Sequence, residues 1–210
     1  MNAKERISEI VKRLKKEYPG LKTALHYKTP FELLVATILS AQTTDAHVNK
    51  ITESLFKKYK TVRDYADVNL DKLKEDVSSI NFYNNKAKNI QGSAKILIEQ
   101  FNSKIPKTMK DLITLPGVAR KTANIVLSNI YGINEGIAVD THVKRLSFRL
   151  GLTENENPIK IERDLMAVTP KEEWGSLSHL LIFHGRKICP AKKPLHNQCV
   201  LYDICPSRDI

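Results

Sequence analysis

Apolar residues recur along this chain at spacings of three and four, which is the pattern of an amphipathic helix. Ile7, Ile10, Val11 and Leu14 lie on one face of the first predicted helix, and a Pro-Gly pair follows it. Such a pair ends a helix, because proline cannot continue the hydrogen-bond ladder and glycine favours the turn that comes next.

The same spacing predicts helices along most of the remaining chain. One of them carries Val48, Ile51 and Leu55, and Asp45 is its expected N-terminal cap. Asn69 is expected to cap a shorter helix. The other predicted helices cover residues 30–41, 84–101, 108–114, 119–131, 140–150, 158–168 and 173–187. Because no segment alternates apolar and polar residues as a strand does, we predict an all-α fold.

The charge of the chain indicates the kind of partner. Its 210 residues include 34 Lys and Arg against 23 Asp and Glu, for a formal net charge of +11. Such an excess favours a polyanion, because each neutralised phosphate releases condensed counterions. No stretch approaches the roughly 20 apolar residues that span a bilayer, and the N-terminal segment lacks the apolar core of a secretory signal. We therefore expect a cytoplasmic protein with reduced thiols and no membrane partner.

Residues 185–210 differ in character from the rest. They contain all three cysteines, three prolines and five basic residues, with little helical periodicity. A segment with so few apolar residues needs another source of order, and a bound metal is the obvious candidate. An odd number of cysteines in a reducing compartment argues against a disulfide.

The motif LPGVARKTA, at residues 115–123, predicts a helix-turn-helix. Leu115 is expected to end a short helix, Gly117 to form a tight turn, and Ala119 to lie where the next helix begins. The first N–H groups of that helix and the positive end of its dipole form a binding site for a phosphate. Thr122 adds a hydroxyl group to this binding site. We expect nucleic acid to be contacted by Leu115, Gly117, Ala119 and Thr122.

Together with VDTHVKR at residues 139–145, this motif resembles the helix-hairpin-helix glycosylase superfamily and, within it, the endonuclease III family. Segments at residues 31–50, 83–90 and 184–189 also resemble this family, and together with the hairpin they occur in the order that the family shows. The resemblance therefore covers in effect the whole chain. It implies a six-helix barrel domain at residues 22–134 and a second helical domain made of residues 1–21 and 135–210. It also implies a monomer with double-stranded DNA in a cleft between the two domains.

The resemblance to the bifunctional branch of this superfamily assigns catalysis to Lys121. This lysine stands beside Arg120 at the positive end of a helix, and both features disfavour its ammonium form. A neutral amine can attack C1′, expel the base and form a Schiff base, after which β-elimination breaks the 3′ phosphodiester. Asp140 is the second expected catalytic residue, because a carboxylate stabilises positive charge on the sugar, and it fits a helix cap equally well. For His142, a phosphate contact and a packing or capping role are both open.

An enzyme that works at C1′ must extrude its nucleotide and fill the gap that remains. The resemblance assigns the gap to Gln42, and it places Phe82 at the position of a leucine wedge. The family usually has Gly-Leu where this chain has Asn81 and Phe82. A core position is the alternative for Phe82, because a lone aromatic between helices is normally buried. Asp45 resembles a residue near the damaged-base pocket, besides its expected capping role.

The cysteines resemble three ligands of a [4Fe–4S] cluster in a loop at residues 189–205. These are Cys189, Cys199 and Cys205, and His196 stands where the family has its second cysteine. Three interpretations are open: His196 ligates iron, the cluster lacks an iron or a protein ligand at that corner, or the Cys3His set holds zinc. A bound metal would fix Lys192 and Lys193, which follow Cys189, where they can meet phosphates.

These features predict a bifunctional DNA glycosylase and AP lyase of base excision repair. Its expected substrates are duplexes that contain oxidised pyrimidines or abasic sites. A mismatch glycosylase acting on adenine or thymine is an alternative, although such relatives usually lack the hairpin lysine. A catalytically silent DNA-binding module is another, and the presence of both Lys121 and Asp140 argues against it. A Mg²⁺ nuclease would need a carboxylate cluster that the sequence does not contain.

Overall fold

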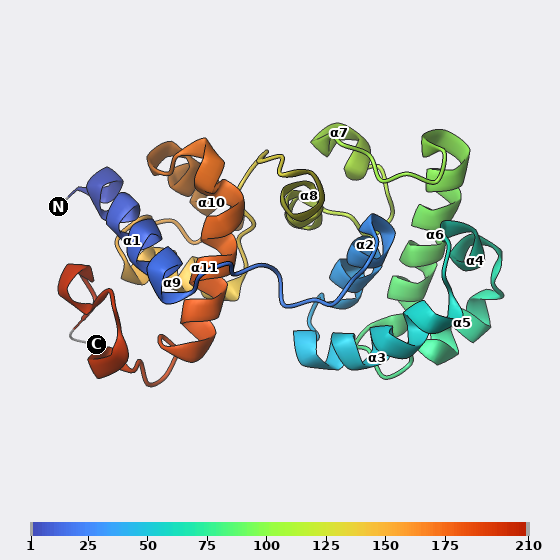
Figure 1. The fold of residues 1–210 in the computed structure, drawn as a ribbon, viewed down its shortest axis with the longest axis horizontal. Helices are drawn as coiled ribbons and strands as arrows, with labels where there is room; N and C mark the ends of the chain where they lie inside the picture. Colours follow the sequence, from blue (N-terminus) through green and yellow to red (C-terminus); the bar gives the residue numbers. More distant parts are fainter. Residues whose placement is uncertain (1, 209–210) are drawn as a thin grey trace. The chain divides into compact units, whose positions relative to one another are not determined.

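The computed structural model describes residues 2–208, and every regular element in this range is a helix (Figure 1). The predicted all-α fold is therefore confirmed. The chain divides into two compact units. The central unit contains Thr23–Ile133, and the terminal unit combines the segment up to Lys22 with the segment from Asn134 onward. Each unit has a hydrophobic core of its own.

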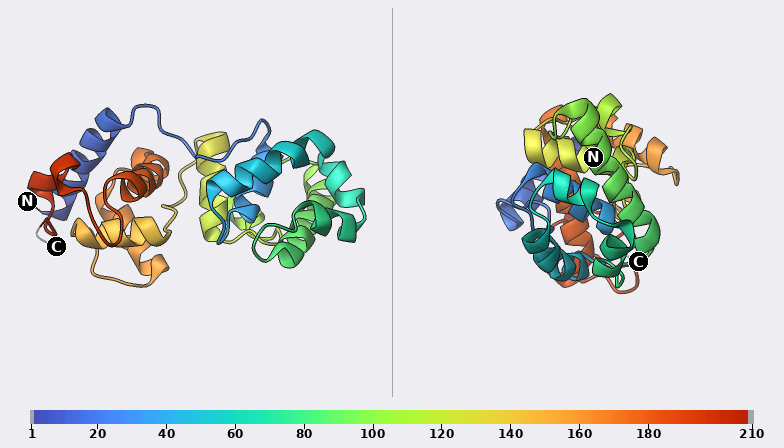
Figure 2. Two further views of the ribbon diagram at one scale, coloured as in Figure 1. Left: turned by 90° about the horizontal axis from the view of Figure 1, so that it is seen from below. Right: turned by 90° about the vertical axis from the view of Figure 1, so that its right-hand side faces the viewer.

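Helix α2 (Pro30–Leu39) forms the middle of the central unit (Figures 1 and 2). Its side chains are buried almost all round, as expected of a helix with apolar residues on every face. A capping box begins it: Thr29 accepts a hydrogen bond from the Glu32 N–H, and the Glu32 carboxylate accepts one from the Thr29 N–H. Around α2 pack α3 (Asp45–Lys58), α6 (Tyr83–Phe101) and α8 (Arg120–Val126).

Shorter helices complete the central unit. They are α4 (Val62–Asp67), α5 (Leu70–Asp76), α7 (Met109–Leu112) and the π-helical η1 (Leu127–Tyr131), which continues α8. Both α4 and α5 pack on α6. Asn69 caps α5 as predicted, because its side chain accepts from the N–H groups of Asp71 and Lys72. Tyr65 of α4 is buried in the core, with its ring centroid 5.2 Å from that of Phe31.

The terminal unit is built around α11 (Trp174–Lys187), on which α1 (Ala3–Glu17) and α9 (Thr141–Arg149) pack. Helix α10 (Pro158–Val168) packs on both α1 and α9. Ile7, Ile10 and Leu14, which the periodicity places on one face, are fully buried in this core. The remaining elements are the 3-10 turns η2 (Lys171–Glu173), η3 (His196–Gln198) and η4 (Tyr202–Ile204). Within residues 2–208, no helix is both long enough and apolar enough to cross a bilayer.

Two local predictions need correction, and one helix was not predicted. Asp45 is not a cap but the first residue of α3, and Thr44 caps this helix by accepting from the His47 N–H at 3.4 Å. Helix α4 was not predicted, because six residues are too few to show a period. Its Thr61–Asp64 capping box was the available signal. The helix predicted at residues 108–114 is reduced to the four residues of α7, so Leu115 lies beyond its end.

Candidate functional site

The hairpin turn between α7 and α8 is held tightly against α6. Gly117 has a φ of +78°, and a β-carbon at this position would lie 2.9 Å from the Cβ of Asn89 on α6. The Ser93 hydroxyl, also on α6, donates to the Pro116 carbonyl at 2.8 Å. Only glycine combines this left-handed backbone with so close an approach. The predicted tight turn at Gly117 is present.

Behind the turn, the hairpin presents the N-terminus of α8 without a capping side chain. Ala119 is the N-cap residue in an extended conformation, and it offers no side-chain hydrogen bond to the first turn. Lys121 is exposed on that first turn and Thr122 is half-buried. The Leu115 side chain, in contrast, is only 2% exposed and belongs to the central core. The contact with nucleic acid that is predicted for Leu115 would therefore be made by its backbone and not by its side chain.

Asp140 is the N-cap of α9 in the terminal unit. Its Oδ1 atom accepts from the N–H groups of His142 and Val143, at 2.8 Å each. The expected capping role is confirmed, and a single oxygen performs it. His142 is half-buried with its Nδ1 3.1 Å from Nη2 of Arg145. Burial lowers the pKa of His142, and Arg145 lowers it further, while the Asp140 carboxylate opposes both.

Gln42 and Phe82, the two predicted gap-filling residues, are both exposed residues of the central unit. Phe82 is 62% exposed, so the alternative of a core position for it is wrong. Both residues have left-handed backbones, with φ values of +54° for Gln42 and +59° for Phe82. That conformation costs about 1–3 kcal/mol in residues other than glycine, so neighbouring contacts must hold each of them in place.

Those contacts come from Asn81 and Lys86, and neither contact was predicted from the sequence. Asn81 donates from Nδ2 to the Gln42 carbonyl at 2.6 Å. Lys86, only 5% exposed, directs its ammonium group to the segment that carries Gln42. A lysine in a polar segment such as YNNKAKNI is expected to be exposed to solvent, and no neighbouring residue in the sequence indicates that Lys86 is buried.

The predicted metal ligands line one small cavity in the terminal unit. Cys189, His196, Cys199 and Cys205 surround a volume of about 30 Å³, and all three cysteines are free thiols. Among residues 2–208, no three His, Cys, Asp or Glu side chains converge closely enough to share a single metal ion. A polynuclear cluster spreads its protein ligands, because each iron carries its own. Three thiols and an imidazole are donors that an iron–sulfur cluster and a zinc ion both accept.

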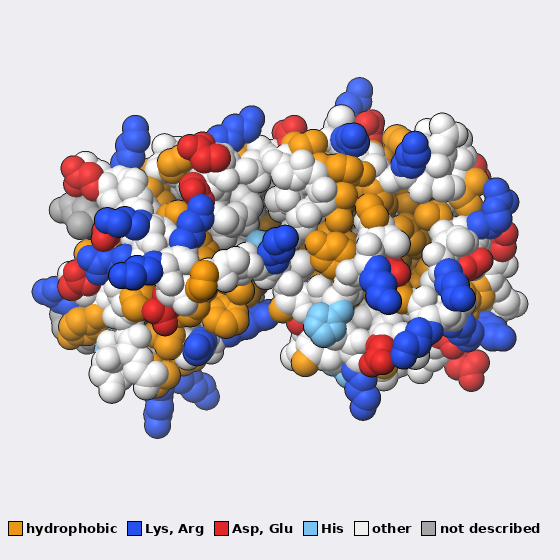
Figure 3. Space-filling model, viewed as in Figure 1, with side chains coloured by type: hydrophobic (Ala, Val, Ile, Leu, Met, Phe, Trp, Pro, Cys, Tyr) orange, Lys and Arg blue, Asp and Glu red, His pale blue; other side chains and the backbone are white. Residues whose placement is uncertain are grey.

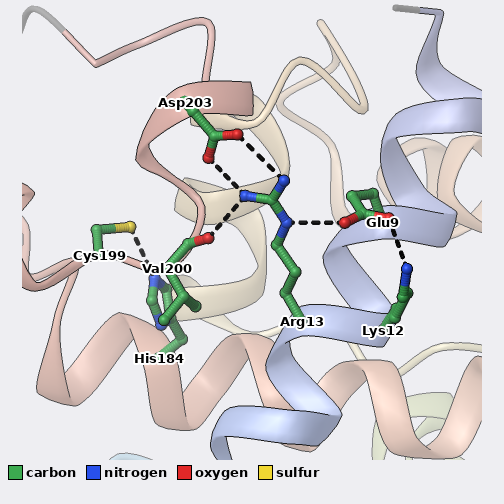
Figure 4. Close-up of polar contacts among 7 residues, drawn as sticks. All are labelled: Glu9, Lys12, Arg13, His184, Cys199, Val200 and Asp203. Atoms are coloured by element: carbon green, nitrogen blue, oxygen red, sulfur yellow. Dashed lines mark hydrogen bonds and ion pairs between the residues drawn. The ribbon is translucent and has the colours of Figure 1, made fainter.

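The cysteine loop is tied to the first helix (Figure 4). Arg13 of α1 donates to the Val200 carbonyl at 3.0 Å and to both carboxylate oxygens of Asp203. His184 of α11 lies with its Nε2 3.4 Å from the Cys199 sulfur, and its Nδ1 contacts the Tyr18 hydroxyl at 3.0 Å. Burial lowers the pKa of His184 to about 4. The family resemblance at residues 184–189 did not indicate this contact of His184.

Basic side chains are distributed over both units. Lys and Arg side chains project from the visible face of each unit in the space-filling view (Figure 3). Lys192 and Lys193 of the cysteine loop are exposed. Lys121 lies in the central unit, whereas Asp140 and the cysteine loop lie in the terminal unit.

Comparison with known proteins identifies the class of protein that has this fold. Residues 35–171 match the model of the HhH-GPD superfamily base excision DNA repair proteins. Endonuclease III of Synechocystis is 52% identical over 97% of this chain and 93% of its own length. Endonuclease III of Bacillus subtilis is 46% identical over 90% of this chain and 86% of its own length.

The structure leads to the same class. It superposes with a TM-score of 0.92 on a trapped covalent intermediate of endonuclease III and DNA, described as an estranged-adenine complex. The two proteins are 44% identical in sequence, and the superposition covers 99% of this chain and 98% of the other. The chain therefore belongs to the endonuclease III family, the DNA glycosylases with AP lyase activity within the HhH-GPD superfamily.

Proposed function

We propose that this protein excises oxidised pyrimidines from duplex DNA and then cleaves the abasic strand, with Lys121 as its nucleophile. The observation that carries the proposal is the position of Lys121. It is an exposed amine on the first turn of α8, directly behind the close turn at Gly117. A DNA strand seated on the N–H groups of this turn would bring its sugar within reach of the amine.

The proposed reaction begins when the Lys121 amine attacks C1′ of the extruded nucleotide. The C1′–N bond breaks, and the base leaves with the bonding electrons and takes up a proton. The amine then loses a proton, and the C1′–O4′ bond breaks as O4′ takes up a proton. The opened sugar now carries a Schiff base between Nζ and C1′. That imine acidifies the C2′ hydrogen. Removal of this hydrogen forms a C2′–C3′ double bond and expels the 3′ phosphate oxygen, which nicks the strand.

Asp140 is the second proposed catalytic residue. Its carboxylate would stabilise the positive charge that develops on the sugar as the base departs, and would accept the proton that Lys121 loses. The capping geometry supports this role, because Oδ1 takes both cap hydrogen bonds and so fixes the direction of the whole carboxylate.

The proposed DNA contacts follow from exposure and charge. Gln42 and Phe82 would enter the duplex to fill the gap beside the extruded nucleotide, and the hairpin backbone with Thr122 would bind the strand. His142, Lys192 and Lys193 are proposed phosphate contacts of the terminal unit. The net charge of +11 supports tight binding that weakens with salt. We further propose that the two units are the domains between which DNA binds, and that the protein acts as a monomer on cytoplasmic DNA.

A [4Fe–4S] cluster is the proposed cofactor, with Cys189, His196, Cys199 and Cys205 as the residues that would hold it. When bound, it would act structurally, by fixing the loop that carries the two lysines. With His196 as a ligand, mild acid should release the metal more easily than from an all-thiolate site, because protonation of the imidazole removes it from the metal.

Borohydride trapping on two duplexes tests the proposed reaction. One duplex contains a thymine glycol and the other a preformed abasic site, and each is treated with the parent protein, Lys121→Gln and Lys95→Gln. Lys95 is an exposed lysine on α6 and serves as the matched control. We expect covalent adducts on both duplexes with the parent and the control, and none with Lys121→Gln. Trapping on the abasic duplex alone would redirect the search to another base, and undiminished trapping by Lys121→Gln would exclude this lysine.

A further inference from the structure

Two loops that lie far apart in the sequence are joined beside α6. The first loop follows α2 and carries Gln42, and the second precedes α6 and carries Phe82. Asn81 bridges them, because its Nδ2 donates to the Gln42 carbonyl oxygen at 2.6 Å. The bridge therefore connects the residue before Phe82 directly to the backbone of Gln42.

Lys86 makes a second and stronger connection to the same loop. Its Nζ donates to the carbonyl oxygens of Leu39 at 2.8 Å and Ala41 at 2.5 Å, and to the Thr43 hydroxyl at 3.3 Å. An ammonium group has three N–H donors, and each has one of these acceptors. Burial lowers the pKa of Lys86 to about 8, so the group is charged at neutral pH and all three donors are available.

The backbone of α6 connects Lys86 to Phe82. The carbonyl of Phe82 accepts from the N–H groups of Asn85 and Lys86, at 3.1 Å each. The N–H groups of the first turn of α6 thus hold the left-handed backbone of Phe82. The side chain of Lys86, which belongs to the same turn, holds the loop that carries Gln42. Because both conformations are unfavourable for side-chain-bearing residues, such contacts are needed if the loops are to be ordered before DNA binds.

We propose that Asn81 and Lys86 form a clamp that fixes Gln42 and Phe82 as one preformed element for opening the duplex. Both are positioning residues, since neither is assigned a contact with DNA or with the reacting atoms. The inference rests on the proposed roles of Gln42 and Phe82. A preformed element would not have to be ordered when DNA binds, and the binding energy is then available for separating a base pair.

Hydrogen exchange of the free protein tests the clamp without any reference to activity. We compare the parent with Asn81→Ala, Lys86→Met and the control Lys95→Met, which removes an exposed lysine from the same helix. The clamp predicts faster amide exchange at residues 40–43 in the first two variants and unchanged exchange in the control. Unchanged exchange in Asn81→Ala and Lys86→Met would overturn the clamp, even if the protein proved to have a different activity.

A pair of substrates tests the consequence for function. The same thymine glycol is placed in a base-paired duplex and in an unpaired bulge, and single-turnover excision is measured on both. Asn81→Ala is expected to slow excision from the paired duplex by about twofold to tenfold, the effect of one hydrogen bond, and to leave the bulge nearly unaffected. Lys86→Met is expected to show a larger loss with the same preference, on the order of a hundredfold.

Each outcome distinguishes the clamp from a general structural role. Equal losses on the paired and bulged substrates would overturn the positioning role, because a misfolded protein fails on both. If Lys86→Met does not fold, Asn81→Ala still decides the question, since Asn81 is exposed and its removal leaves the core intact. Failure of the parent protein on both substrates would contradict the proposed function alone, and the exchange experiment would still test the clamp.

Discussion

Substitution of Gly117 by alanine gives a direct test of how the hairpin is held. Two effects act at this position. The φ of +78° is unfavourable for any residue with a β-carbon, and the added methyl would lie 2.9 Å from both Cβ and Nδ2 of Asn89. Because one of these contacts is with a β-carbon, a rotation of the Asn89 side chain cannot relieve it. The turn or helix α6 must therefore move.

The magnitude follows from separating these two effects. A left-handed alanine costs about 1–2 kcal/mol. Overpacking that forces a backbone shift adds about 1–3 kcal/mol. Gly132 provides the matched control, because its φ of +64° is similar and no atom lies within 4 Å of an added β-carbon. Gly132→Ala should therefore show the conformational cost alone, and Gly117→Ala should be less stable than it by about 1–3 kcal/mol.

Urea unfolding and borohydride trapping on an abasic duplex measure the two consequences. We expect Gly117→Ala to unfold at a lower urea concentration than Gly132→Ala, and to trap more slowly because the displaced turn no longer seats the strand. Gly132→Ala should trap at the parent rate. Equal stability of the two variants would refute the steric part of this reasoning. Normal trapping by a destabilised Gly117→Ala would show that the turn does not position the strand for Lys121.

Substitutions at three residues test the other unit. Asp140→Asn should keep α9 capped, because Oδ1 alone accepts both hydrogen bonds, but should slow trapping; Asp140→Ala should in addition lose about 0.5–2 kcal/mol in urea unfolding. His196→Ala should lower the iron bound per chain while His196→Cys retains it, and equal iron contents would exclude an imidazole ligand. Hydrogen bonds from Thr153 and Asn155 lower the pKa of Asp164 below 3.8, so its contribution to stability is present above that pH and is lost as the pH falls through the lowered pKa. Asp164→Asn should therefore reduce the dependence of unfolding on pH in this acidic range, and an unchanged pH profile would contradict the assignment.

Features that depend on neighbouring residues could be predicted from the sequence. The apolar spacing placed Ile7, Ile10 and Leu14 on one buried face, and the Pro-Gly pair indicated the turn at Gly117. Caps were harder, since Thr44 and Asp45 are adjacent and chemically similar capping residues, and the choice between them depends on where the first helical turn begins.

Features that depend on distant segments could not be predicted. Lys86 is buried because its acceptors are carbonyl groups more than 40 residues earlier in the chain, and no local pattern records that pairing. Phe82 is exposed for a related reason. Its left-handed backbone turns the side chain outward just before α6, whereas aromatic character alone favours burial. The resemblance to a family located both loops, but it did not indicate what holds them.

The cysteine loop is held to its unit by arginines from outside the loop, not by a core of its own. Within residues 189–208, Leu201 is the only fully buried side chain. Arg13 binds the Val200 carbonyl, and Arg149 of α9 binds the carbonyls of Pro190 and Ala191. These contacts fix both ends of the stretch that contains Lys192 and Lys193. The proposed cluster would instead join the ligands to one another and so set the shape between those ends.

Loss of the metal should therefore disturb the two lysines without releasing the loop from α1 and α9. Arg13 and Arg149 hold the loop through the backbone carbonyls of Val200, Pro190 and Ala191, and these contacts do not involve the sulfurs. Arg149 also donates from Nη1 to the Cys189 sulfur at 3.1 Å, and this one contact would change with the metal. Metal-free protein should then keep its helical content while its DNA affinity falls, with a lower salt dependence of binding because fewer phosphates are contacted. A loss of helical content in parallel with the metal would instead mean that the cluster, and not the arginines, holds the terminal unit together.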